Sequence, residues 1–325
     1  MDIKGVSSLM KNRKVFALLF LFFLQGPFLF AQEDMLKLLN EQDTLLGKEF
    51  VNPAFKTNRI INLQTAEVIK KKMLDIKIAH RFSALGTSSN GTSSIHNLWG
   101  FDESSDIRIS FDYGLNNNWN VGFARSKYLE NWELNSKYKL ASQRRDNSMP
   151  FTATLFAVAA YSSKQSLNYI FDNPSSQTEF NRRFAFASQL IISRKFSDRF
   201  SFEISPIYVH RNFVNADDNN EAFAIGTGGR YRITKRMSLI ADYVYNLGEY
   251  RKINNKNGIY NPLGLGLEFE TGGHVFSLMF TNAEAINETQ FVTNTVDTWT
   301  KGGTRFCFTI ARGFDLSKKK VATNL

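Results

Sequence analysis

The sequence predicts an all-β fold, a closed antiparallel transmembrane β-barrel of about twelve strands. Three observations carry this prediction. Many segments alternate between large apolar and charged or small residues, short polar turns alternate with longer links, and the chain begins with an export signal. We take these in order, beginning with the clearest strand.

Residues 106–115 show the alternation most plainly. One face would carry Ile107, Ile109, Phe111, Tyr113 and Leu115, and the other Asp106, Arg108, Ser110, Asp112 and Gly114. Alternation at period two is the strand signal. A strand buried on both faces would be apolar throughout, whereas a transmembrane barrel strand has lipid outside and a polar lumen inside.

Twelve segments share this pattern, and we predict a strand in each. They are residues 73–82, 106–115, 119–125, 132–140, 151–161, 183–196, 200–210, 223–233, 237–247, 263–269, 274–280 and 304–314. Short polar turns such as 116–118, 197–199, 234–236 and 271–273 alternate with longer links, without exception in this interpretation. Outer-membrane barrels have this asymmetry, with short periplasmic turns and longer outer loops.

The N-terminus predicts export. Residues 11–14 are mainly basic, residues 15–24 are an unbroken apolar run, and Ala31 precedes the expected cleavage site. An uncleaved membrane anchor is the alternative. We therefore expect a signal peptide at 1–31, a periplasmic N-terminal segment at 32–72 with a short helix that is a candidate partial plug, the barrel at 73–314, and a tail at 315–325.

The net charge indicates the class of partner, and the cysteine content bears on disulfide bonding. The net charge of +10 falls to +7 when residues 1–31 are removed, because they hold four bases and one acid. In an exported protein this favours anionic surfaces, such as outer-membrane lipid and lipopolysaccharide, over nucleic acid. The single cysteine, Cys307, excludes an internal disulfide framework.

The polar faces of the strands carry both signs of charge. The acids are Asp75, Asp106, Asp112, Glu133, Glu203, Asp242, Glu268 and Glu270, and the bases are Lys77, Arg81, Arg108, Lys137, Lys139, Arg183, Arg230, Arg232 and Arg305. A charge-selective pore would show a ring of one sign, so the mixture predicts a salt-bridged interior in a narrow barrel.

A soluble β-sandwich or a lipocalin-like barrel is the alternative, but its enclosed charges would lack water at a cost of several kcal/mol each, roughly. Our candidates for lumen ion pairs or ligand contacts are Arg81, Arg108, Asp112, Arg230, Glu270 and Arg305. For Arg81 the candidate partners are Asp112 and Glu270.

Catalytic, cofactor-binding and metal-ligating motifs were sought and none is predicted. The four histidines do not lie at metal-ligand spacing, and there is no His-x-Ser motif of the kind expected in an outer-membrane phospholipase. Residues 226–229 (GTGG) lie inside a predicted strand, where small residues at a barrel bend explain them better than a phosphate loop does. We expect no enzymatic activity and no cofactor.

Several short runs resemble a known family. They are residues 55–62 (FKTNRIIN), 80–82 (HRF), 98–102 (LWGFD), 105–108 (SDIR), 113–115 (YGL) and 121–126 (VGFARS). Together they resemble a Bacteroidota family of outer-membrane β-barrels that is catalogued as a domain of unknown function, over roughly residues 50–314. The resemblance implies an outer-membrane barrel and supplies no catalytic residues.

These observations predict an outer-membrane β-barrel that acts as a narrow channel or binds and transports a small solute. One alternative is a structural or assembly component of an envelope complex, with a periplasmic envelope protein as partner. A third is an outer-membrane enzyme that modifies lipid. The sequence does not identify the solute.

Overall fold

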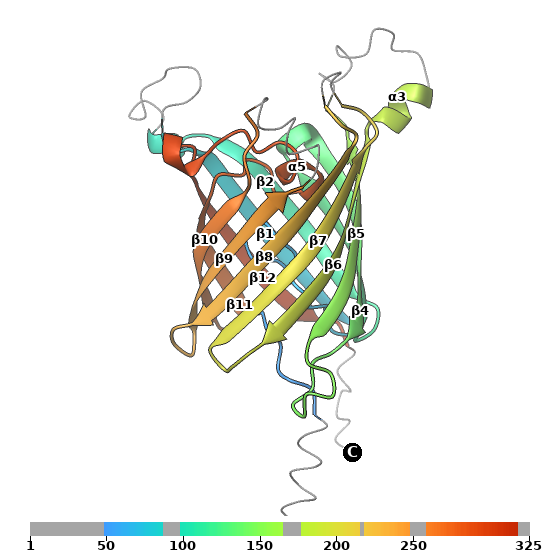
Figure 1. Ribbon diagram of the computed structural model, residues 1–325, viewed down its shortest axis with the longest axis vertical. Helices are drawn as coiled ribbons and strands as arrows, with labels where there is room; N and C mark the ends of the chain where they lie inside the picture. Colours follow the sequence, from blue (N-terminus) through green and yellow to red (C-terminus); the bar gives the residue numbers. More distant parts are fainter. Residues whose placement is uncertain (1–48, 87–97, 165–176, 215–217, 248–257, 318–325) are drawn as a thin grey trace, which may run out of the picture. The chain divides into compact units, whose positions relative to one another are not determined.

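Twelve antiparallel strands close into one barrel in the computed structural model of the protein (Figure 1). Each strand pairs with its neighbours in the sequence, and β1 closes the barrel by pairing with β12. The structure describes residues 49–86, 98–164, 177–214, 218–247 and 258–317. The predicted signal peptide, the predicted helix before residue 49 and the last residues of the tail lie outside these ranges.

The strands occupy the positions that the alternation predicted, with ends that differ by a few residues. They are β1 (Met73–Ala84), β2 (Ser104–Gly114), β3 (Trp119–Ser126), β4 (Asn131–Ala141), β5 (Thr152–Ser162), β6 (Phe184–Lys195), β7 (Phe200–Arg211), β8 (Glu221–Arg232), β9 (Met237–Asn246), β10 (Leu263–Thr271), β11 (His274–Thr281) and β12 (Arg305–Asp315). The predicted fold class is therefore confirmed.

The two faces of each strand point as predicted. In β2, Asp106, Arg108 and Asp112 are buried inside the barrel, whereas Ile109 and Phe111 are exposed on its outer wall. Apolar side chains with a period of two thus form an outer surface that matches lipid, and the charged face is enclosed. Among the described residues, no helix is both long and apolar enough to cross a membrane.

The two ends of the barrel differ in the length of their connections. We call the end with the turns 115–118, 196–199, 233–236 and 272–273 the short-turn end, and the opposite end the long-link end. The expected strict alternation is wrong in one place. Only four residues join β3 to β4 at the long-link end, because the 3-10 turn η2 (Tyr128–Glu130) reverses the chain there, whereas residues 142–151 join β4 to β5 at the other end.

The interior holds buried ion pairs, as predicted, and also a large apolar region that was not predicted. The inner faces of β5 to β9 carry a cluster of buried apolar side chains that includes Phe156, Ile191 and Val209. Among the described residues, the inner faces of β1 to β4 carry seven buried charged residues, among them Lys77, Arg108 and Glu133, against four on β5 to β9. One side of the lumen therefore offers an apolar surface and the other a polar one.

A small second unit comprises, among the described residues, Glu49, Phe50 and residues 144–148. Phe50 and Arg144 form an isolated antiparallel bridge, and the Arg144 guanidinium lies 5.5 Å from the centroid of the Phe50 ring. The backbone N–H of Arg145 donates to Glu49 O at 3.1 Å. These contacts join two short pieces of chain that are far apart in the sequence.

Candidate functional site

The N-terminal segment, residues 51–72, runs inside the barrel before β1 begins (Figure 1). Every residue from 58 to 66 is buried. Its centre is a tight turn in which Arg59 and Gln64 form an antiparallel bridge and Ile60 N donates to Leu63 O at 2.9 Å. We call residues 59–64 the lumen turn.

The carboxylate of Asp242, on the inner face of β9, holds the tip of the lumen turn. Its Oδ2 accepts the backbone N–H groups of Ile61, Asn62 and Leu63 at 3.2, 2.5 and 2.9 Å, and its Oδ1 accepts Asn62 Nδ2 at 2.8 Å. Successive N–H groups that converge in a turn form a concave binding site for an anion. Here a strand carboxylate fills that site and fastens the segment to the wall.

Glycines on the inner face of β8 leave room for the lumen turn. A Cβ atom added to Gly226 would lie 2.6 Å from Leu63 Cδ2, and one added to Gly228 would collide with Ile60 Cδ1. Gly226 and Gly228 therefore lack side chains where the segment packs against the wall. The prediction that residues 226–229 mark a barrel bend missed this role, because a close approach between distant segments leaves no local pattern.

The link between β11 and β12 folds into the barrel from the long-link end. Residues 285–293 are all buried, and they include the short helix α5 (Glu288–Phe291), which begins after Asn287. Phe291 and Val292 join the apolar cluster of the wall, together with Leu63 of the lumen turn. We call residues 282–304 the inward loop. Apolar burial fixes it to the apolar side of the lumen.

The lumen turn and the inward loop meet inside the barrel through an ion pair. Arg59 Nη2 lies 2.5 Å from Glu288 Oε1, and both side chains are buried. Arg59 Nη1 also donates to Asn62 O at 2.6 Å and to Ile286 O at 3.0 Å, while Gln64 Nε2 donates to Glu288 Oε1 at 2.9 Å. Two segments that enter from opposite ends thus contact each other inside the barrel.

Arg81, a candidate from the sequence, contacts both of these segments. Its guanidinium donates to Ala283 O at 3.0 Å and to Ala285 O in the inward loop, and to Asn62 Oδ1 at 2.8 Å in the lumen turn. It pairs with neither of its two candidate partners. The carbonyl oxygens and the amide that it contacts come from in-folded segments, which strand alternation does not reveal.

Arg305 and Asp112 each hold one of the segments. Arg305 Nη1 donates to Asn282 O at 3.1 Å, and its Nη2 lies 2.5 Å from Asp297 Oδ2, so it anchors the inward loop. Asp112 Oδ2 accepts Asn58 Nδ2 at 3.0 Å, next to the lumen turn.

The remaining candidates form ion pairs in two separate places. Arg108 binds Glu133 through Nε and Nη2, both at 2.8 Å, on the polar side of the lumen. Arg230 binds Glu268 at 2.8 Å and Glu270 at 3.4 Å near the short-turn end. The six residues therefore do not converge on one site.

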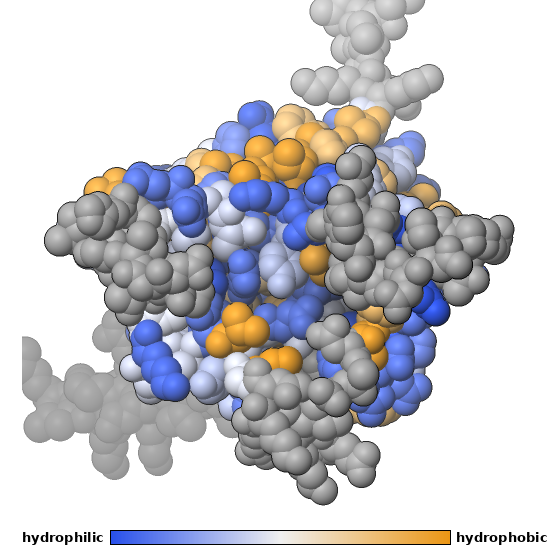
Figure 2. Space-filling model, turned by 90° about the horizontal axis from the view of Figure 1, so that it is seen from above, coloured by the Kyte–Doolittle hydropathy of each residue, from blue (hydrophilic) through white to orange (hydrophobic). Residues whose placement is uncertain are grey.

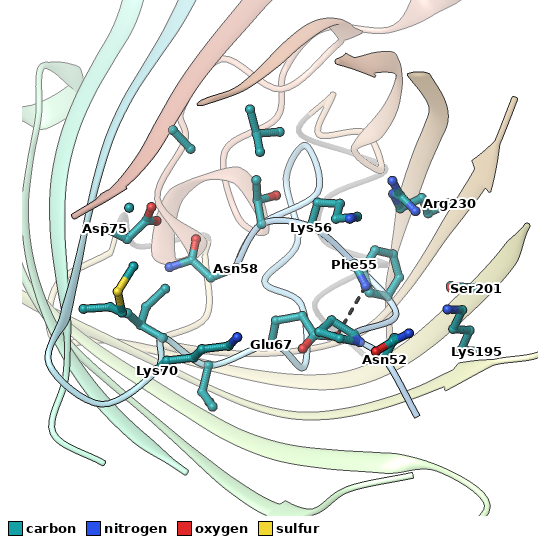
Figure 3. A pocket seen from close by; sticks show the side chains of 18 of the residues that line it. Asn52, Phe55, Lys56, Asn58, Glu67, Lys70, Asp75, Lys195, Ser201 and Arg230 are labelled. Carbon is teal, nitrogen blue, oxygen red and sulfur yellow. Dashed lines mark hydrogen bonds between the residues drawn. The ribbon is translucent and has the colours of Figure 1, made fainter. Parts of the chain in front are cut away.

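A cavity of about 550 Å³ lies between the N-terminal segment and the wall at the short-turn end (Figure 3). Its walls carry Lys56, Lys70, Lys195, Arg230 and Arg232, the acids Glu67, Asp75 and Asp198, and apolar groups such as Pro53 and Phe55. Figure 3 shows charged side chains of different strands around one space. The sequence did not predict this cavity.

Glu67 belongs to the N-terminal segment and lies on the cavity wall. Its carboxyl oxygen accepts Ala54 N at 2.8 Å and Phe55 N at 3.3 Å, which closes a loop in the segment. Burial raises the pKa of this carboxyl group above 4.5, although nearby Lys139 acts in the opposite direction. Docking of the segment therefore makes this carboxyl group easier to protonate.

Arg59, Asn62, Asp242 and Glu288 were not among the predicted site residues. Asp242 was assigned to the lumen by its position on a strand, but nothing local indicated its partner. Asn287 followed by Glu288 could have indicated the start of a helix, since Asn caps helices and acids favour the first turn. That signal would have predicted α5 but not its place inside the barrel.

At the long-link end, hydrophilic and intermediate residues cover most of the central part of the barrel mouth (Figure 2). Within the described part of the chain, no cluster of three or more metal-ligating side chains is present, and Cys307 is a buried free thiol.

Comparison with known proteins finds several similar solved structures and one matching family model. No curated protein matches the sequence. Similar solved structures include the KdgM porin (8% identity, TM-score 0.45, covering 74% of this chain and 99% of that one). The NanC porin (10%, 0.43, 74% and 98%) and an outer-membrane channel from Pseudomonas putida F1 (10%, 0.42, 77% and 98%) are also similar.

A family model also matches most of the sequence. It is described as the membrane bound beta barrel domain (DUF5777), and it matches residues 55–314, which include the lumen turn, all but the last residue of β12 and the inward loop. The chain therefore belongs to this family of membrane-bound β-barrel domains.

Proposed function

We propose that this membrane-bound barrel is a narrow channel for a small polar solute in the bacterial outer membrane, described here in a closed state. The observation that carries the proposal is the buried Arg59–Glu288 ion pair, which closes a polar lumen through two segments that are not strands. A lumen closed by in-folded segments can open when a segment leaves.

The N-terminal segment is the better candidate for the moving part. Hydrogen bonds to strand side chains hold much of this segment in place. Asp242 accepts the N–H groups of the lumen turn, Lys137 Nζ donates to Asn58 O and Thr65 O at 2.9 Å each, and Thr154 Oγ1 donates to Ala66 O at 2.7 Å. Water can replace such bonds, so the net cost of exchanging one is only about 1 kcal/mol. Both segments also bury apolar side chains, Ile60, Ile61 and Leu63 in the lumen turn and Phe291 and Val292 in the inward loop. The inward loop, however, is joined to a strand at both of its ends, whereas the N-terminal segment is joined to a strand only at β1.

The partners follow from this arrangement. The exposed outward side chains, such as Leu134 and Leu278, suit contact with outer-membrane lipid, including lipopolysaccharide in the outer leaflet. In outer-membrane barrels the short turns are periplasmic, so the N-terminal segment would be reachable by a periplasmic envelope protein. Nothing in the lumen contacts requires catalysis, and we propose a non-enzymatic role.

Single-channel recording in planar bilayers tests the proposal. The native chain should conduct rarely, and Asp242→Ala should increase the fraction of time spent open because the lumen turn loses its main acceptor. Asp102→Ala is the matched control, since Asp102 is exposed at the long-link end and lies outside both the lumen turn and the cavity. If Asp242→Ala folds to a heat-modifiable barrel but never conducts, the channel proposal is wrong.

A second role is favoured by one specific observation. Leu63 of the lumen turn packs in the same apolar cluster as Phe291 and Val292, so part of the lumen filling is a hydrophobic core. A permanent core of this kind suits a structural or assembly component that anchors an envelope complex. This role would be favoured if neither the native protein nor the Asp242→Ala variant conducts in the recording.

A further inference from the structure

The cavity at the short-turn end has a row of polar side chains across three adjacent strands. Lys195 of β6 pairs in register with Ser201 of β7, and Ser201 pairs with Arg230 of β8. Directly opposed residues on antiparallel strands have Cβ atoms only about 5 Å apart. Arg232 follows two residues after Arg230 on the same face, and all four residues line the cavity.

The positive charges in this row are only partly neutralised. Arg230 is bound by Glu268 and Glu270, but the acid near Lys195 is Asp198, at 3.6 Å, whose side chain is 86% exposed. An exposed pair of this kind contributes little. Within the described ranges, no acid lies within ion-pair distance of Arg232 or of Lys70, which faces the cavity from the N-terminal segment.

The acidic side chains of the cavity do not neutralise this remaining positive charge. Asp75 lies 3.8 Å from Lys77 on the β1 wall, and Glu67 accepts two backbone N–H groups within its own segment. Glu270 is shared between Arg230 and Lys56, which lies 3.0 Å away. The cavity therefore keeps an excess of cationic donors on its β6–β8 side.

We propose that this cavity binds a small organic anion, a solute with carboxylate or phosphate groups, through Lys195, Ser201 and Arg232. Lysine, arginine and hydroxyl groups donate charge-assisted hydrogen bonds to such oxygens. The apolar side chains of Pro53 and Phe55 face the same space and would contact the carbon skeleton. This inference rests on the proposed function, since it names the class of solute that such a channel would take.

Isothermal titration of the full chain in a zwitterionic detergent tests the inference, with succinate and inorganic phosphate as probes and putrescine as a cationic control. The double variant Lys195→Gln, Arg232→Gln should weaken binding of the anions about tenfold or more, the effect of losing charge-assisted bonds. The matched control is Lys235→Gln, Arg236→Gln, which removes the same charge from the exposed β8–β9 turn. Heat-modifiable mobility checks that each variant is folded.

The inference is supported if the native chain binds succinate or phosphate, the cavity variant loses affinity and the turn variant keeps it. It is overturned if the native chain binds neither anion, if putrescine binds equally well, or if both double variants behave alike. Conductance is measured separately, so a chain that binds anions without conducting would refute the channel and leave the binding site standing. A chain that conducts but binds neither anion would support the channel and refute the binding site.

Discussion

Arg59 and Glu288 lie 229 residues apart in the sequence and form an ion pair with a 2.5 Å separation in the middle of the barrel. Each belongs to a different in-folded segment, and each segment is anchored to different strands. The pair therefore couples the lumen turn to the inward loop. Disturbing either residue should affect the closure of the lumen, while the barrel wall itself is held by strand pairing.

Removing one partner of this pair should weaken docking of the two segments far more than removing both partners. Glu288→Gln or Arg59→Met alone leaves a buried partner uncompensated, at a cost of about 3–5 kcal/mol to docking of the segments. Arg59→Met with Glu288→Leu should recover much of that loss. A double-mutant cycle on the open probability in planar bilayers measures the coupling, and additive effects of the two single changes would contradict it.

Gly226→Ala should displace the lumen turn, because its new Cβ would lie 2.6 Å from Leu63 Cδ2 and 2.8 Å from Cδ1. Overpacking of this kind costs about 1–3 kcal/mol. Cys307 reports the displacement, since its buried thiol packs in one cluster with Phe55, Ile60 and Ile61. We expect faster modification of Cys307 by a water-soluble maleimide.

Gly229→Ala is the matched control for this change. Its Cβ would find Ser201 O at 3.9 Å, an ordinary contact, on the same strand. Its maleimide rate should equal that of the native chain. Equal rates in all three proteins would mean that the lumen turn accepts the extra methyl group without moving.

Docking of the N-terminal segment should weaken as the pH rises. Burial raises the pKa of Glu67 above 4.5 in the docked state, so the docked state binds the proton more tightly than the free segment does. The contribution of this proton is complete below pH 4.5 and is lost as the pH rises through the raised value. The open fraction should therefore grow with pH in the native channel.

Glu67→Gln supplies the comparison for the pH series, because the amide keeps an acceptor oxygen and cannot titrate. Its open fraction should vary less with pH than that of the native protein over the same range. A native chain and a Glu67→Gln variant with the same pH profile would assign the dependence to another group.

An arginine introduced on the lipid-facing side of the barrel should destabilise it more near the middle of a strand than near its end. Leu278→Arg, in the middle of β11 and pointing outward, should cost about 2–4 kcal/mol of barrel stability, whereas His274→Arg on the same face near the strand end should cost about 0–1 kcal/mol. Urea unfolding in lipid vesicles compares the two variants, which differ little in net charge. Equal losses would contradict a membrane around this face.

The outward and inward faces of the strands could be predicted residue by residue. Phe111 and Phe186 point outward and Arg108, Arg230 and Arg305 point inward, as the alternation required. The partners of the inward residues could not be predicted. Arg108 meets Glu133 two strands away, but Arg81 and Arg305 bind carbonyl groups of the inward loop, and a carbonyl carries no sequence signal.

The sequence by itself determined the barrel, the direction of each face and the polarity of half of the interior, because strand alternation is a local property that repeats every two residues. Only the tertiary structure decided what fills the lumen. The lumen turn and the inward loop have no strand pattern, and their positions depend on contacts such as Asp242 with Leu63 and Arg59 with Glu288 across about 180 to 230 residues of chain. Such contacts exist only after the barrel has closed and brought its inner faces within hydrogen-bonding distance.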